Sequence, residues 1–151
     1  MESVFAGIEP KHAALWGRHT VRLRHRLAES ELFSDAGLAA LLEAVPAKTL
    51  TITTMAAEGH DLDSWRHVAR AGLSGEQLLA AVHAGRIWIH LSAINEVDPR
   101  FSALLARAYD ELHAAIPGFR TFKQRLGLLV SSPGAQVFYH VDKPGQGLWQ
   151  I

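Results

Sequence analysis

Residues 131–151 read SSPGAQVFYHVDKPGQGLWQI, and the predicted fold depends on this stretch more than on any other. The Ser-Pro-Gly tripeptide at 132–134 predicts a tight turn, because proline fixes φ and glycine accepts a positive φ. Residues 135–142 predict a strand after that turn. Side chains two residues apart in a strand project from the same face, so we expect His140 and Asp142 to lie side by side.

The pair His140 and Asp142 is a candidate metal clamp. An imidazole nitrogen and a carboxylate oxygen are two of the three ligands in the facial triad that holds non-haem Fe(II) and leaves the other metal positions open. A histidine and an aspartate at this spacing also occur often by chance, and a strand-end histidine followed by a turn aspartate needs no metal. The spacing alone leaves both interpretations open.

The composition describes an ordinary globular domain. The 151 residues include 15 Lys and Arg, 15 Asp and Glu, 48% hydrophobic residues and no cysteine. The balanced charge gives no global field for nucleic acid or for an anionic membrane, so neither is expected as a partner. The lack of cysteine excludes disulfides and thiolate sites and fits a reducing cytosol. Without a signal-peptide pattern or an apolar run of about eighteen residues, we expect a cytoplasmic protein.

Hydrophobic periodicity predicts alternating helices and strands before residue 120. Apolar residues at helical spacing, with capping residues beside them, predict three helices, at 35–45, 74–85 and 98–116. Alternating apolar and polar residues predict four strands, at 19–27, 50–55, 86–91 and 121–131. The polar segment 58–65 could hold a metal, but a loop followed by a short helix through Val68 explains it more simply.

The predicted strand at 19–27 has a basic outer face, because Arg22, Arg24 and Arg26 alternate with apolar residues. One interpretation is a patch for nucleic acid or an acidic substrate. The other is a solvated strand face, or a sheet edge that charge keeps soluble. We favour the second, since no basic cluster of comparable density follows.

The motifs of residues 131–151 resemble a known family. SSPGA, then an H-x-D pair, then L-x-Q-I follow in the order found around the first metal-binding strand of the cupin-like, JmjC-type Fe(II)/2-oxoglutarate-dependent oxygenases. Upstream, His25 and Leu27 precede a helix opened by Phe33, Ser34 and Asp35, which looks like the leader of these proteins. The specific resemblance covers about one seventh of the chain.

The resemblance implies an α+β fold. Residues 1–118 would form a mainly helical N-terminal region with a few strands, and residues 119–151 would start a double-stranded β-helix of the cupin and jelly-roll type. The barrel, normally of eight strands, would be incomplete in this chain. Both regions would belong to one continuous domain.

The resemblance also implies the site and its chemistry. His140 and Asp142 would be the first two ligands of Fe(II), with 2-oxoglutarate as cosubstrate in the hydroxylation of an unactivated C–H bond. Gln146 and Gln150 are the nearest polar groups that could support the ligands or the cosubstrate. No further catalytic residue is implied, and the substrate, a peptide or a small molecule, stays open.

The chain departs from the family pattern after Asp142. The family's third ligand is a histidine on a later strand, and a later basic residue pairs with the 2-oxoglutarate carboxylate, but the sequence stops nine residues after Asp142. Val137 stands where many members have Thr or Ser. We therefore expect the N-terminal portion of a longer protein that binds iron weakly and is inactive alone. Whether the chain is an enzyme stays open.

A different class of function fits the same pattern. A cupin fold without a complete triad could serve as a non-catalytic interaction or regulatory domain, because function depends on the site and not on the fold. Such a domain would form a homodimer through the open edge of its sheet.

Overall fold

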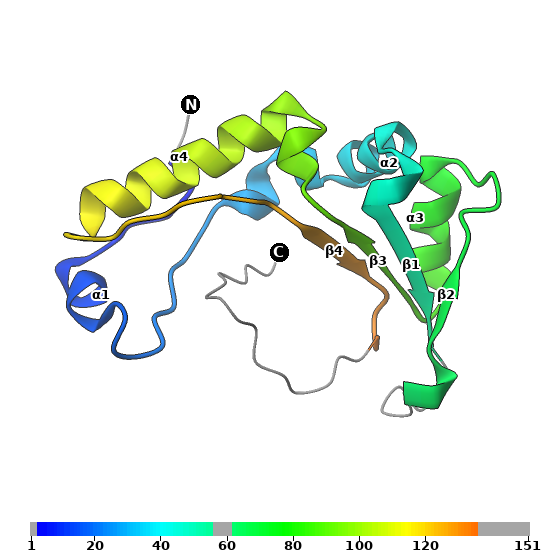
Figure 1. Ribbon diagram of the computed structural model, residues 1–151, viewed down its shortest axis with the longest axis horizontal. Helices are drawn as coiled ribbons and strands as arrows, with labels where there is room; N and C mark the ends of the chain where they lie inside the picture. Colours follow the sequence, from blue (N-terminus) through cyan, green and yellow to red (C-terminus); the bar gives the residue numbers. More distant parts are fainter. Residues whose placement is uncertain (1–2, 56–61, 136–151) are drawn as a thin grey trace. The chain divides into compact units, whose positions relative to one another are not determined.

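The computed structural model describes residues 3–55 and 62–135, and Figure 1 labels their main helices and strands. They form an α+β protein with a small, open, antiparallel sheet, which confirms the predicted fold class at this level. The chain divides into two compact units. Unit 1 combines residues 1–34 with 92–127, and unit 2 combines residues 35–91 with 128–151.

Unit 2 is built on a four-stranded sheet in the order β2-β1-β3-β4. Its strands are β1 (Leu50–Thr54), β2 (Arg66–Val68), β3 (Ile87–Leu91) and β4 (Leu128–Ser131). Ile52 lies opposite both Val68 and Ile89, and Ile89 lies opposite Val130. Directly paired residues share a face, so these side chains line one side of the sheet.

Helices α2 (Asp35–Ala44) and α3 (Gly75–Ala84) complete the core of unit 2, with α3 packed on β3 and α2 packed on α3. Ser74 and Gln77 form the predicted capping box at the start of α3. The buried apolar residues of this unit come from both helices, from the strands and from the segments that follow α2 and β1: Ala39, Leu41, Leu42, Val45, Ile52, Met55, Leu78, Leu79, Val82, Ile89 and Leu91.

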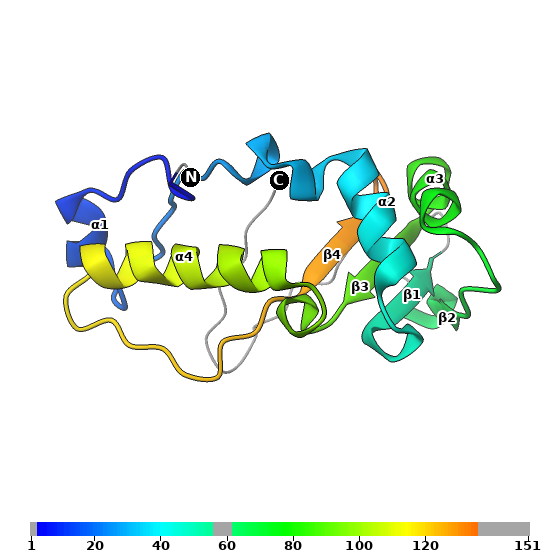
Figure 2. The same ribbon diagram turned by 90° about the horizontal axis from the view of Figure 1, so that it is seen from above.

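Unit 1 is organised around α4 (Pro99–Ala115). Asp98 caps this helix by accepting a hydrogen bond from the backbone N–H of Arg100 at 2.9 Å. The predicted apolar stripe is confirmed, because all of its members are buried: Phe101, Leu104, Leu105, Ala108, Leu112 and Ile116. Figures 1 and 2 both show α1 (Pro10–Leu15) beside the C-terminal end of α4. There the ring of Trp16 meets that of Phe119 edge to face, with centroids 5.1 Å apart.

Short 3₁₀ turns join the larger elements. They are η1 (Leu27–Glu29), η2 (Glu31–Phe33), η3 (Ala47–Thr49), η4 (Leu62–Ser64) and η5 (Ile94–Glu96). Among the described residues, no helix combines the length and the apolar character needed to cross a membrane.

The predicted strand at 19–27 is wrong, although its pattern of exposure is correct. Arg22, Arg24 and Arg26 are exposed while the residues between them are half-buried. The segment pairs with residues 4–6 through one isolated bridge, between Phe5 and His25. A period of two shows that a backbone is extended, but it does not supply a partner strand.

Two other predicted elements differ at their ends. The short helix predicted through Val68 stops at Ser64, because residues 66–68 pair with β1 as a strand. The strand predicted at 121–131 is restricted to residues 128–131, where β3 supplies the hydrogen-bonding partner. In both places a partner distant in sequence decided the local structure.

Candidate metal centre

The residues predicted to hold metal or cosubstrate, His140, Asp142, Gln146 and Gln150, lie outside the described residues. The predicted metal pair and the two glutamines therefore stay predictions. The structure describes the chain that leads to them, from β4 through the Ser-Pro-Gly turn to Ala135.

Ser132 fixes the end of β4 to its neighbour β3. Its backbone N–H donates to the carbonyl oxygen of Ile87 at 2.9 Å, and its Oγ accepts from the N–H of Ile87 at 3.0 Å. Ser132 is also one of the few buried polar residues, so both bonds are shielded from water. The point at which the chain leaves the sheet is therefore held by a side chain as well as by the strand ladder.

The predicted turn after Ser132 is confirmed. The N–H of Ala135 donates to the carbonyl oxygen of Ser132 at 3.0 Å, which closes a four-residue turn. Gly134 has φ of 78°, the conformation required at the third position of a type II turn, and Pro133 occupies the second position, where its fixed φ fits. This part of the SSPGA motif reverses the chain directly before the segment that carries His140 and Asp142.

The side of the sheet opposite the helices carries polar and aromatic residues. Thr53 Oγ1 and His67 Nδ1 are 3.1 Å apart on neighbouring strands. The ring of Trp88 meets that of Trp65 edge to face, with centroids 5.2 Å apart. His90 lies on this side too, since it pairs with Thr51.

No metal centre is formed by the residues that the structure describes. Across residues 3–55 and 62–135, no group of three His, Cys, Asp or Glu side chains is positioned to hold a metal ion. His67 already shares a hydrogen bond with Thr53. The imidazole of His140 and the carboxylate of Asp142 suit Fe(II) chemically, and their role as metal ligands stays a prediction.

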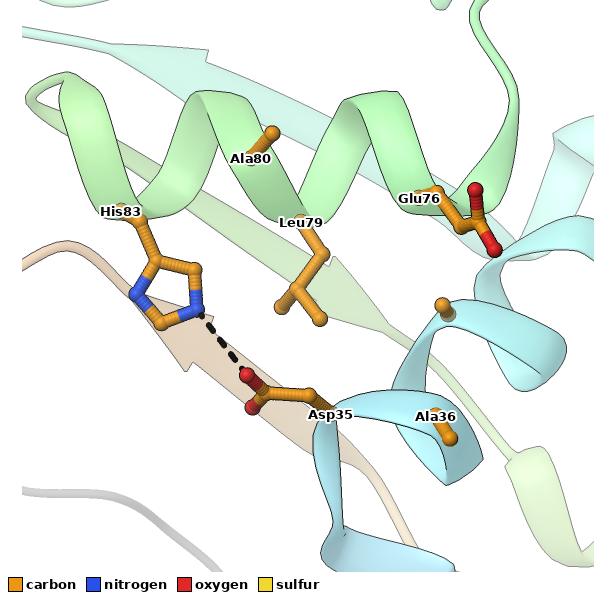
Figure 3. A pocket seen from close by; sticks show the side chains of 7 residues that line it. Asp35, Ala36, Glu76, Leu79, Ala80 and His83 are labelled. Atoms are coloured by element: carbon orange, nitrogen blue, oxygen red, sulfur yellow. Dashed lines mark ion pairs between the residues drawn. The ribbon is translucent and has the colours of Figure 1, made fainter.

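A shallow hollow of about 300 Å³ lies between α2 and α3, and no local sequence pattern predicts it (Figure 3). His83 Nε2 and Asp35 Oδ2 lie 3.7 Å apart across it, and Glu76 stands at its rim. Asp35 begins one helix and His83 ends the other, which suits both helix dipoles. Both side chains are largely exposed, so the pair adds little stability.

Glu111 of α4 accepts three hydrogen bonds from residues 3–5, and no local sequence pattern predicts them. Its oxygens accept hydrogen bonds from the Ser3 hydroxyl at 2.7 Å, from the Val4 N–H at 2.7 Å and from the Phe5 N–H at 3.0 Å. Burial alone would raise the pKa of Glu111, but these bonds, together with the charge of Arg107, lower it below its ordinary value. The carboxylate ties the first residues to α4.

No family model, curated protein or solved structure matches this chain.

Proposed function

We propose that this chain belongs to a cupin-like, JmjC-type Fe(II)/2-oxoglutarate-dependent oxygenase, in which His140 and Asp142 supply two of the iron ligands. The observation that carries the proposal is the tail motif, in which SSPGA precedes an H-x-D pair and L-x-Q-I follows it. The fold proposed for the whole protein is a double-stranded β-helix, of which the strands near residue 130 would be the first.

The described end of β4 supports the proposal. Ser132 pins the strand to β3, and a type II turn at residues 132–135 precedes His140 and Asp142 in the sequence. A metal site needs ligands on a firmly held element, because small displacements weaken coordination. A strand that starts from an anchored turn meets this requirement better than a free loop would.

The roles of the residues follow from their chemistry. His140 would bind through an imidazole nitrogen and Asp142 through a carboxylate oxygen, on one face of the metal. Gln146 and Gln150 would orient ligands or cosubstrate through their amide groups. Bound Fe(II) with 2-oxoglutarate would supply the oxidising chemistry that protein side chains lack. A facial triad needs a second histidine, so two ligands alone make a weak site.

Anaerobic titration with Fe(II) tests the proposal. We expect the wild type to bind one equivalent, and His140→Ala or Asp142→Ala to weaken binding at least about tenfold. The matched control is His83→Ala, which removes a histidine that also lies near a carboxylate, Asp35. This control should bind iron as the wild type does. Equal iron uptake by the wild type and His140→Ala would overturn the assignment.

The second candidate is a non-catalytic interaction domain that forms a homodimer. An edge strand of one protomer's sheet would pair with the same strand of its partner. The edge strand β2 favours it, because all three of its residues are exposed and Val68 leaves 43% of its surface in solvent. Light scattering after size-exclusion chromatography would test this alternative. A dimer that Val68→Lys dissociates, in a protein without iron affinity, would support the interaction domain over the oxygenase.

A further inference from the structure

Unit 1 carries a row of three arginines on the segment that follows α1. Arg22, Arg24 and Arg26 are exposed, whereas Val21 and the other intervening residues are half-buried. Figure 1 shows this segment as the blue trace between α1 and the light-blue turns. The half-buried residues pack one side of the backbone against the protein, and all three arginines are accessible to solvent.

Backbone hydrogen bonds keep the segment extended. The N–H of Ala6 donates to the carbonyl oxygen of Arg24 at 2.9 Å, and the N–H of Arg26 donates to that of Val4 at 2.8 Å. Val4 and Phe5 are themselves buried, so the partner backbone is well anchored. In an extended chain, alternate residues repeat about every 6.7 Å. These bonds hold the backbone at Arg24 and Arg26, and the exposed side chains extend from it.

No carboxylate of the described residues neutralises the row. Arg22, Arg24 and Arg26 form no ion pair within residues 3–55 and 62–135, and neither Glu29 nor Glu31, which follow directly, bonds to them. Three other cations of unit 1 do have acidic partners: Lys11 pairs with Glu9, Arg100 with Asp98 and Arg125 with Glu96.

The structure removes one explanation that the sequence had favoured. Charge on an exposed strand usually keeps a sheet edge from pairing with other chains. This segment is no edge of the four-stranded sheet, which belongs entirely to unit 2. Among residues 3–55 and 62–135, it pairs with residues 4–6 alone. Protection of a sheet edge therefore does not account for three arginines in a row.

We propose that the arginine row binds the phosphate backbone of a single-stranded nucleic acid. Guanidinium groups match phosphate oxygens bidentately, and all three residues are Arg rather than Lys. A flexible single strand can follow an extended row of cations, and it carries a phosphate at every nucleotide. The balanced charge of the whole protein excludes a global field but not this local one.

A nucleic acid fits the row better than an acidic peptide does. Every nucleotide carries a phosphate, so each guanidinium meets a charge in any register. An extended peptide would need a carboxylate at every second residue and would have to dock in one register. Contacts of this kind give sequence-independent affinity with a Kd of about 10⁻⁴ to 10⁻⁶ M at physiological salt. This inference does not depend on the proposed oxygenase activity.

Fluorescence anisotropy of a labelled single-stranded oligonucleotide tests the inference. Three phosphate contacts predict that log K falls against log salt with a slope of about −2. The triple variant Arg22→Gln, Arg24→Gln, Arg26→Gln should bind at least about tenfold more weakly and with a much smaller slope. Since these side chains are exposed, circular dichroism should show an unchanged fold.

The matched control removes the same net charge at three cations that already have acidic partners: Lys11→Gln, Arg100→Gln and Arg125→Gln. This variant should keep most of the affinity. Equal losses in both triple variants would overturn the assignment to the row, as would a wild type that does not bind the oligonucleotide. Preferential binding of a glutamate-rich peptide would overturn it in favour of an acidic protein partner.

Discussion

Gly75→Ala tests how closely α2 and α3 approach each other. A Cβ at position 75 would lie 1.9 Å from the carbonyl oxygen of Ala39 and 2.9 Å from the backbone nitrogen of Glu43. Real Cβ atoms essentially never approach other heavy atoms below 3.0 Å, and both obstacles are backbone atoms that no rotamer change can move. The two helices would therefore have to separate by about 1 Å, which close-packed interiors resist.

The separation would also disturb a hydrogen bond to a charged group. The N–H of Gly75 donates to Glu43 Oε2 at 2.7 Å, and Arg70 binds the same oxygen at 2.6 Å. Overpacking costs about 1–3 kcal/mol, and a weakened bond to a charged group adds about 1 kcal/mol. The better helix propensity of alanine offsets this destabilisation by less than about 1 kcal/mol. Because the clash is with backbone atoms, we take the upper end of the overpacking range and expect a net loss of about 3 kcal/mol in the free energy of unfolding.

Urea unfolding followed by circular dichroism measures this loss. With a slope of about 2 kcal/mol per molar urea, the midpoint should fall by about 1.5 M. Hydrogen exchange should also show faster opening of α3. Glu76→Ala is the control, because it places alanine at the adjacent, exposed position of the same helix. If Gly75→Ala lowers the midpoint no more than Glu76→Ala does, the close approach of the two helices is refuted.

Three further predictions concern the Glu111 carboxylate, the N-cap of α3 and the hydrophobic core. Glu111→Gln should lower stability by about 1–2 kcal/mol at neutral pH, since a neutral amide replaces a carboxylate that accepts three hydrogen bonds. Folding lowers the pKa of Glu111, so the ionised carboxylate stabilises the folded state above the unfolded pKa near 4.5. This stabilisation disappears as pH falls through the pKa of Glu111 in the folded state. Urea titrations from pH 7 to 3 should show the loss in the wild type but not in Glu111→Gln. Ser74→Ala should cost about 1 kcal/mol in urea unfolding, and an unchanged midpoint would contradict the role of the capping box. Phe101→Ala, at a fully buried ring that meets Phe33 edge to face, should cost about 3–5 kcal/mol by the same assay, and a loss below about 1 kcal/mol would mean that the ring is not in the core.

The candidate site was predictable only as far as local spacing reaches. Two residues of separation in a predicted strand place His140 beside Asp142, and proline followed by glycine predicts the turn that Gly134 adopts. The anchor at Ser132 was not predictable, because its partner Ile87 lies 45 residues away. Completion of a metal centre depends on such distant partners.

The sequence by itself determined α4, the capping box of α3 and the strands β1 and β3. Each depends on interactions within about four residues or on the side-chain period of one element, so the pattern of apolar and capping residues is sufficient. Asp98 before Pro99 and the stripe from Phe101 to Ile116 predicted a helix that the structure reproduces almost to the residue.

Only the tertiary structure decided which extended segments became strands and which long-range contacts stabilise each unit. Residues 66–68 join the sheet because β1 offers an edge, whereas residues 19–27 alternate more regularly and join none. The contact of Gly75 with Ala39 and the bonds of Glu111 to residues 3–5 likewise join positions far apart in sequence. The physical reason is that a hydrogen-bonded ladder and a close helix crossing each require a second segment, and no local pattern specifies which segment that will be.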